Sequence, residues 1–108
     1  MKKRILTGIT TTGTPHIGNY IGAIRPAIEM TKDSDESFFF LADYHSIIKN
    51  QDSDSIKNSV KNVALAWLSS GLDPNKSYFY KQSDVPEIIE LCWICLLYTS
   101  PSPRDKRL

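Results

Sequence analysis

An unbroken apolar run, Phe38 to Leu41, lies near the middle of the chain and shows no alternation of apolar with polar positions. A strand with one face in water alternates with a period of two residues. A strand that helices cover on both faces reads instead as a continuous apolar stretch. The run therefore predicts a strand over residues 37–42, buried on both faces within a parallel sheet.

Helical patterns flank this strand on both sides, as the crossovers of a parallel sheet require. The pattern before it repeats at helical spacing, at Ile17, Tyr20, Ile21, Ile24 and Ile28. Pro26 lies inside this helix and cannot donate to the carbonyl of Gly22, which predicts a kink or a weak second half of the helix. The pattern after the strand is capped at Asp52 or Ser53 and closes at Gly71. Its buried face is predicted at Ile56, Val60, Val63, Ala64, Trp67 and Leu68.

Two more strands and a third helix complete the pattern. The first strand covers residues 3–8, and the third begins at Tyr78 and runs to Gln82. Asp84, with Glu87 three residues on, resembles a capping box for a helix that contains Cys92 and Trp93. Trp67, Trp93, Cys92 and Cys95 are interpreted as core residues. The order β-α-β-α-β-α predicts an α/β fold, the first half of a Rossmann-like, doubly wound parallel sheet.

Composition narrows the function classes. The 108 residues carry a formal charge of +1. An autonomous nucleic-acid-binding domain is usually strongly basic, so the net charge gives no evidence for that class. The longest apolar stretch, Leu91 to Tyr98, is well short of the roughly 20 residues of a membrane span, so the expected location is cytoplasmic, with no membrane partner. Two cysteines can form neither a disulfide framework nor a zinc site of two cysteine pairs.

Polar clusters follow each predicted strand, where an open parallel sheet binds its ligands. They are residues 10–19, 43–46 and 82–84. The first combines threonine hydroxyls with a helix start, whose free N–H groups favour phosphate. It matches neither the Walker loop nor the dinucleotide pattern of three glycines. Gly18 and Gly22 would let a base or a strand approach the backbone closely.

The run Pro15 to Tyr20, Pro-His-Ile-Gly-Asn-Tyr, resembles the first signature of class I aminoacyl-tRNA synthetases. Asn19 stands where many members carry a second histidine, and with residues 18–25 this is similar to the bacterial tryptophan–tRNA ligases. Three further matches follow in the family's order, at residues 42–46, 71–74 and 82–86. The resemblance covers roughly residues 3 to 94 and implies the nucleotide-binding core of class I synthetases, of the HUP type.

The resemblance implies that the parent enzyme activates tryptophan with ATP and releases pyrophosphate. It then transfers tryptophan to tRNA(Trp). It also implies Mg²⁺ on the ATP phosphates, no tightly bound cofactor, no protein-held metal and a homodimer. Attack of a carboxylate on the α-phosphorus needs positioning and charge stabilisation more than covalent catalysis. Hydrogen-bond donors at a helix start are suited to that role.

The family's site residues carry over position by position. The resemblance implies ATP binding by Thr10, Thr11, Thr12, His16, Gly18 and Asn19, with His16 and Asn19 as the catalytic pair. It implies a tryptophan pocket that includes Leu6, Gly8, Asp43 and His45. Structural interpretations stay open beside these roles. His16 could be an ordinary helix-start residue, His45 could cap a loop, and Asp43 could be a turn former.

The chain departs from the family in several places. Its first ATP-contacting stretch is Thr-Thr-Thr where many members have Gln-Pro-Ser. The later Lys-Met-Ser-Lys-Ser-like loop, the acidic residue that reads the indole N–H and the anticodon-binding helices have no counterpart here. We therefore expect residues 1–94 to be the N-terminal part of a catalytic domain that is inactive alone. Residues 95–108 are expected to be a non-native or disordered tail.

Two other function classes stay open at this point. A small nucleotidylyltransferase could use the same loop, although it would need histidine where Asn19 stands. A non-catalytic nucleotide-binding module would bind ATP without preferring an adenylate. Binding of a tryptophanyl-adenylate analogue would separate these classes from a synthetase.

Overall fold

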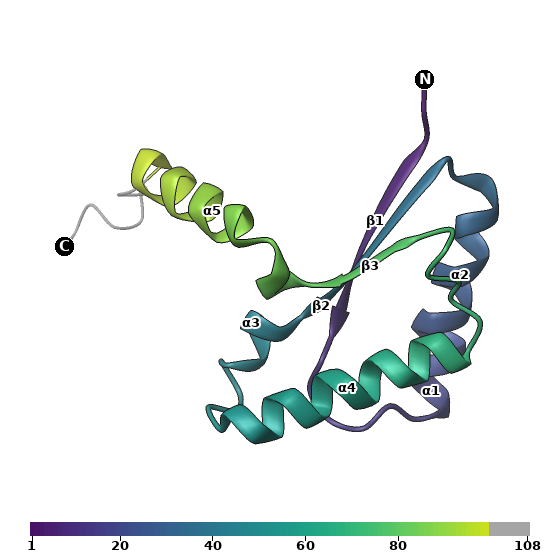
Figure 1. Ribbon diagram of the computed structural model, residues 1–108, viewed down its shortest axis with the longest axis horizontal. Coiled ribbons are helices and arrows are strands. Elements are labelled where there is room, and N and C mark those ends of the chain that lie inside the picture. Colours follow the sequence, from purple (N-terminus) through teal and green to yellow (C-terminus); the bar gives the residue numbers. More distant parts are fainter. Residues whose placement is uncertain (100–108) are drawn as a thin grey trace.

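The computed structural model describes residues 1–99, which form a three-stranded parallel sheet with the order β1-β2-β3 (Figure 1). The strands are β1 (Arg4–Thr10), β2 (Glu36–Ala42) and β3 (Tyr78–Lys81). In the register, Thr10 pairs with Ala42, and Leu41 pairs with Lys81. The predicted parallel sheet with the Phe38–Leu41 run at its centre is confirmed.

The connection from β1 to β2 is helical from Ile17 to Asp33, in four consecutive segments. They are α1 (Ile17–Asn19), the π-helical η1 (Tyr20–Ile24), α2 (Arg25–Met30) and the short η2 (Thr31–Asp33). A π-helical turn therefore stands where a kink was predicted at Pro26. The wider turn places its last bond from the N–H of Arg25 to the carbonyl of Tyr20. Pro26 lies just after this turn, so its missing N–H donor does not interrupt a regular α-helix.

The connection from β2 to β3 consists of α3 (Asp43–Ser46) and α4 (Ser53–Ser69). Asp52 caps α4, as predicted, by accepting a hydrogen bond from the N–H of Ser55 at 3.1 Å. Gly71 closes this region with a φ of 112°, a conformation that side chains disfavour. The segment after β3 comprises η3 (Gln82–Asp84) and α5 (Pro86–Thr99).

The core lies on the face of the sheet that α2 and α4 cover. Its members are Ile9, Ile24, Ala27, Phe39, Leu41, Val63, Trp67 and Leu72. Phe39 is fully buried, and its ring centroid lies 5.7 Å from that of Trp67. Trp67 is therefore a core residue, as predicted. Leu68 is 39% exposed, so its predicted place on the buried face is wrong.

The opposite face of the sheet carries aromatic side chains that the described residues do not cover. Phe38 stacks on Tyr78 with ring centroids 4.7 Å apart, and Phe40 stacks on Tyr80 at 6.2 Å. Tyr78 remains 57% exposed. The expectation that β2 is covered on both faces is thus met on one face only within residues 1–99.

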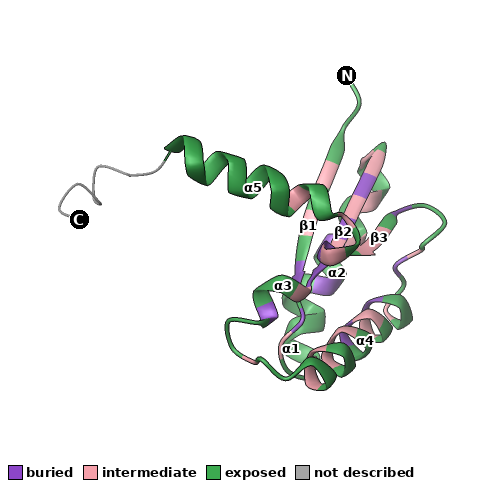
Figure 2. Ribbon diagram, turned by 60° about the vertical axis from the view of Figure 1, so that its left-hand side comes forward, coloured by how far each residue is buried: buried purple, intermediate pink, exposed green. Residues whose placement is uncertain are grey.

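Helix α5 projects away from the sheet and contains no buried residue (Figures 1 and 2). Trp93 is 61% exposed, and Cys92 and Cys95 are exposed as well. Their predicted core positions are therefore wrong in this chain. From Leu91 to Tyr98 this helix is apolar on every side, which requires burial, and no described element packs along it. The predicted Asp84 capping box is also absent, because Asp84 accepts from the N–H of Lys81 instead.

Residues 95–99 continue α5 as helix, so secondary structure does not break at Cys95. The remainder of the predicted disordered tail, residues 100–108, lies outside the described residues. Within residues 1–99, no helix combines the length and the apolar character that crossing a bilayer demands.

Phe39→Ala is expected to lower the free energy of unfolding by about 3–5 kcal/mol, because it removes a fully buried ring from the sheet–helix interface. Leu65→Ala on α4, where Leu65 is 54% exposed, is the matched control and should change stability by about 0.5 kcal/mol or less. Urea titrations followed by circular dichroism measure both variants. Equal losses would contradict this placement of the core.

Candidate functional site

A cavity of about 410 Å³ opens at the carboxyl end of β1. Its walls come from β1, the loop that follows, α1, η1 and α4. It is lined by Gly8, Ile9, Thr10, Thr12, Thr14, Pro15, Asn19, Ala23, Ile24, Val63 and Trp67. β1 is an edge strand in the order β1-β2-β3. In doubly wound sheets the order reverses beside the first strand, and ligands bind at that point. The cavity therefore lies where such a sheet takes its nucleotide.

His16 and Asn19 form a reciprocal cap at the start of α1. The backbone N–H of His16 donates to Asn19 Oδ1 at 2.9 Å. The N–H of Gly18 donates to His16 Nδ1 at 3.0 Å. His16 Nδ1 is thus an acceptor, which leaves the proton of a neutral ring on Nε2. The Asn19 side chain therefore holds the His16 backbone, and the Gly18 N–H holds the His16 ring.

Gly18 makes this cap sterically possible. A Cβ atom at position 18 would stand 2.8 Å from His16 Cε1 and 3.0 Å from His16 Nδ1. Real Cβ atoms do not approach other atoms this closely, so the imidazole could not fold back onto the helix start. Gly18 therefore leaves room for the His16 ring at the helix start, in addition to any contact with a ligand.

The three consecutive threonines differ in what their side chains do. Thr11 is 1% exposed, and its hydroxyl bonds to the hydroxyl of Ser46 and to the carbonyl of Ala42. Thr10 and Thr12 both line the cavity at the end of β1. Thr11 therefore ties the loop to the end of β2, while its two neighbours face the space available to a ligand.

His45 lies on α3, and its Nδ1 is 3.2 Å from Oε1 of the buried Gln82. Together with Thr10 and Thr12 it lines a second cavity of about 170 Å³. The structure thus brings a residue of the predicted tryptophan pocket beside two residues of the predicted ATP loop.

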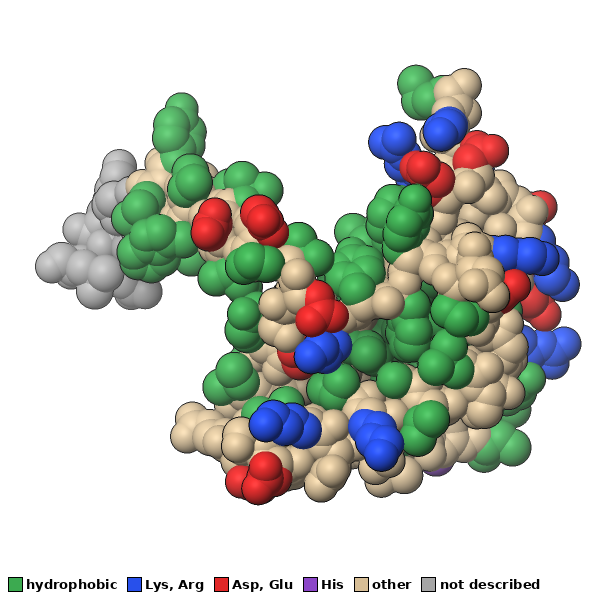
Figure 3. Space-filling model, in the orientation of Figure 1, with side chains coloured by type: hydrophobic (Ala, Val, Ile, Leu, Met, Phe, Trp, Pro, Cys, Tyr) green, Lys and Arg blue, Asp and Glu red, His purple; other side chains and the backbone are tan. Residues whose placement is uncertain are grey.

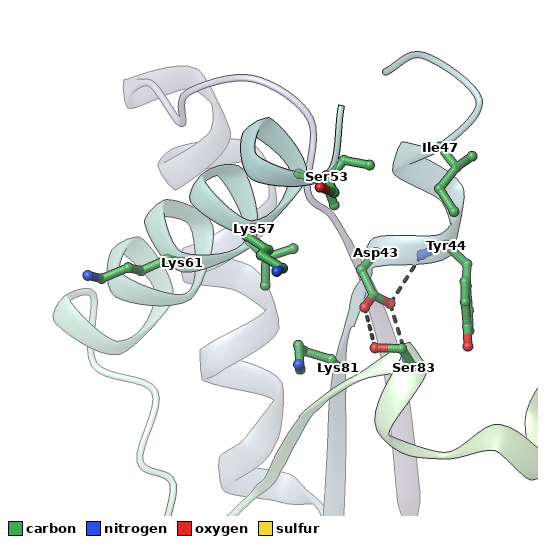
Figure 4. A pocket seen from close by; sticks show the side chains of 10 residues that line it. Asp43, Tyr44, Ile47, Ser53, Lys57, Lys61, Lys81 and Ser83 are labelled. Carbon is green, nitrogen blue, oxygen red and sulfur yellow. Dashed lines mark hydrogen bonds between the residues drawn. The ribbon is translucent and has the colours of Figure 1, made fainter. Parts of the chain in front are cut away.

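Asp43 joins the ends of β2 and β3. Its Oδ1 accepts from the backbone N–H of Ser83 at 3.1 Å, and its Oδ2 accepts from the Ser83 hydroxyl (Figure 4). This pairing uses both carboxylate oxygens, which supports a structural role for Asp43. Asp43 and Ser83 also line a third cavity, of about 480 Å³. It lies beside α4, which contributes Lys57 and Lys61 to its lining (Figure 4). Figure 3 shows hydrophobic side chains gathered in the hollow between this helix and the sheet.

Leu6 and Gly8 lie on the uncovered face of β1. Leu6 is 68% exposed. Gly8 pairs with Phe40, whose ring covers it so closely that a Cβ atom would stand 2.8 Å from Phe40 Cζ. Gly8 is therefore required for the packing of a neighbouring aromatic ring, whatever else it contacts.

The chain matches the family model described as tRNA synthetases class I (W and Y) over residues 1–101. The chain belongs to this family. The tryptophan–tRNA ligase of Neisseria meningitidis is 56% identical over 100 residues, which is 92% of this chain and 30% of that protein. The tryptophan–tRNA ligase of Xanthomonas axonopodis pv. citri is 59% identical over 95 residues, or 22% of its length. The chain thus spans less than a third of these relatives.

Solved synthetase structures give the same result. The tryptophanyl-tRNA synthetase of Campylobacter jejuni superposes with a TM-score of 0.83 at 43% identity, over 92% of this chain and 31% of that one. A second structure of that enzyme, complexed with ADP and tryptophan, also has a TM-score of 0.83. The Rossmann-like synthetase core expected from the sequence is confirmed.

Within this synthetase core, the predicted residues fall into two groups. Thr10, Thr12, Asn19 and His45 line two neighbouring cavities, with His16 and Gly18 at the adjoining cap. Thr11 and Asp43 are engaged in bonds within the protein, and Leu6 lies on the open face. Ser46 and Gln82, which bond to Thr11 and His45, were not among the predicted site residues. Their positions after β2 and β3 at the ligand-binding edge were the available signal.

Gly18→Ala is expected to displace the His16 ring and break its hydrogen bond from the residue 18 N–H, since the new Cβ would overlap the imidazole. Gly22→Ala is the matched control. Nothing lies within 4 Å of a Cβ there, and alanine is the better helix former by up to about 1 kcal/mol. NMR of the His16 ring nitrogens should change only in the first variant. An unchanged His16 spectrum in Gly18→Ala would contradict the cap.

Proposed function

We propose that this chain is the N-terminal part of the catalytic core of a tryptophan–tRNA ligase. The parent enzyme would join tryptophan to ATP as tryptophanyl-adenylate and then transfer it to tRNA(Trp). The observation that carries the proposal is the His16–Asn19 cap beside the threonine-lined cavity at the end of β1. The 56% identity to a tryptophan–tRNA ligase supports it.

The proposed first step is an in-line displacement at the α-phosphorus of ATP. A carboxylate oxygen of tryptophan forms the new bond to phosphorus. The bond between the α-phosphorus and its bridging oxygen breaks, and pyrophosphate leaves with that oxygen and the electron pair. Charge builds up on the phosphoryl oxygens, so donors fixed in advance stabilise it without reorganising. His16 Nε2–H and the hydroxyls of Thr10 and Thr12 are the donors that this chain would supply.

The hydrogen bond between His16 and Asn19 explains how an asparagine can function at position 19. Its Oδ1 accepts from the backbone of His16 and fixes the loop, while its amide nitrogen remains free to donate. We propose that this NH₂ group and the Gly18 backbone face the nucleotide. Thr11 would contribute indirectly by anchoring the loop to Ser46.

Mg²⁺ is proposed to enter with the ATP phosphates. It favours oxygen ligands, keeps several waters and binds substrate phosphates readily. No group of three or more His, Cys, Asp or Glu side chains suited to a metal occurs within residues 1–99, so the phosphates are its natural ligands. Its chemistry when bound would be to neutralise the charge of the leaving pyrophosphate.

Leu6, Gly8, Asp43 and His45 are proposed to lie at the tryptophan side of this site. tRNA(Trp) binding, a homodimer and action in the cytoplasm are proposed for the parent enzyme. The open aromatic face and the exposed apolar helix α5 provide surface that further protein would cover.

A chimera tests the proposed activity. Residues 1–94 of this chain replace the aligned part of the Neisseria meningitidis ligase, which supplies the rest of the catalytic domain. The chimera should catalyse tryptophan-dependent exchange of pyrophosphate into ATP. His16→Ala in the chimera should lower kcat/KM by about 100-fold, because it removes a positioned donor.

Asn58→Ala, on the exposed surface of α4, is the control and should leave exchange unchanged. Circular dichroism establishes that each chimera folds. A folded chimera without exchange activity, or one that His16→Ala leaves fully active, would refute the proposal.

The isolated 108-residue chain is expected to show no tryptophan-dependent pyrophosphate exchange, since it spans 30% of its Neisseria relative. Calorimetric titration with ATP, tryptophan and a tryptophanyl-adenylate analogue should show weak binding at most, tightest for the analogue. Measurable exchange that disappears when both His16 and Asn19 are replaced would show that this part alone suffices.

A further inference from the structure

Gln82 is a buried polar residue with a specific neighbour. It directly follows β3, is 6% exposed, and its Oε1 lies 3.2 Å from His45 Nδ1. A buried amide needs a partner, because leaving it unpaired costs about 1–3 kcal/mol. The imidazole of His45 provides that partner from the end of the adjacent strand.

With its Oε1 facing the ring, Gln82 favours one tautomer of His45. The amide oxygen can only accept, so Nδ1 must carry the proton and donate it. In a neutral ring Nε2 then holds the lone pair and acts as an acceptor. His16 has the opposite arrangement, since its Nδ1 accepts from Gly18 and its Nε2 carries the proton. The two histidines of this chain therefore present opposite hydrogen-bonding groups.

Two bonds of the neighbouring residue fix the turn that carries Gln82. The next residue, Ser83, donates to Asp43 through both its N–H and its hydroxyl. Asp43 lies at the start of the same short helix, α3, that carries His45. The turn after β3 is thus attached to α3 at two points, so Gln82 and His45 have little freedom to separate.

We propose that Gln82 is a positioning residue that orients His45 and presents its Nε2 as a hydrogen-bond acceptor to the ligand. His45 lines the cavity shared with Thr10 and Thr12. The matching ligand group is a hydrogen-bond donor, such as the ammonium group of an amino acid. This assignment of a ligand group rests on the proposed function, whereas the tautomer and its control by Gln82 do not.

NMR of the ¹⁵N-labelled chain tests the tautomer without any ligand. At alkaline pH, where imidazoles are neutral, His45 should show a protonated Nδ1 and an unprotonated Nε2, and His16 should show the reverse. His45→Gln assigns the signals, because the chain has only two histidines. A predominantly Nε2-protonated His45 would overturn the proposal.

Substitutions identify the cause. Gln82→Met keeps the length and burial but removes the acceptor, so the two ring nitrogens of His45 should move toward averaged shifts. Gln82→Glu restores an acceptor and should restore the Nδ1–H form. Ser83→Ala removes the hydroxyl bond to Asp43 but keeps the backbone N–H bond that holds the turn, so it serves as control, with the His45 tautomer retained. A His45 tautomer that is unaffected by Gln82→Met would refute the positioning role.

The chimera tests the consequence for the ligand. Gln82→Met should raise the KM for tryptophan about tenfold, the effect of one hydrogen bond, and leave the KM for ATP unchanged. Gln82→Glu should recover most of the loss. Equal changes in both KM values would indicate general damage and overturn the proposed role in ligand binding. If NMR shows the expected His45 tautomer but the chimera is inactive, the result would contradict the proposed function and leave the positioning role of Gln82 intact.

Discussion

The parallel register of the sheet is the constraint on which the site depends. Thr10 is paired with Ala42 and Leu41 with Lys81, so all three strands end at the same edge. Each strand is followed at once by polar residues, which can therefore meet across the sheet. The bonds from Thr11 to Ser46 and from Asp43 to Ser83 span 35 and 40 residues of sequence. A shift of the register would separate these partners and the cavities between them.

Much of this arrangement could be predicted because the signals are local. The apolar run at Phe38 to Leu41 indicated the central strand, and the periodicity around Val63 and Trp67 indicated the helix that covers it. The polar residues at the strand ends located the site, since topology alone places ligands there. These features depend on spacing within a segment, which a single sequence displays in full.

The features that could not be predicted at α5 and at the site depend on a partner elsewhere in the chain. Periodicity showed that Trp93 lies on an apolar helix, but burial requires a second surface, and residues 1–99 provide none. The sequence likewise did not show that Thr11 is buried while Thr10 and Thr12 line the cavity, because the position of Thr11 depends on Ser46, far along the chain. Gln82 was overlooked for the same reason, since its role exists only beside His45.

The cap at the start of α1 sets what the side chain at position 19 must provide. What the helix start requires from this residue is an acceptor for the His16 N–H, and both an amide oxygen and an imidazole nitrogen can accept. An amide also keeps an NH₂ donor whatever the pH, whereas imidazole gains and loses a proton near neutrality. Asn19 therefore supplies the cap and a fixed donor together. The cap constrains only the accepting atom, and the rest of the side chain is free to serve the ligand.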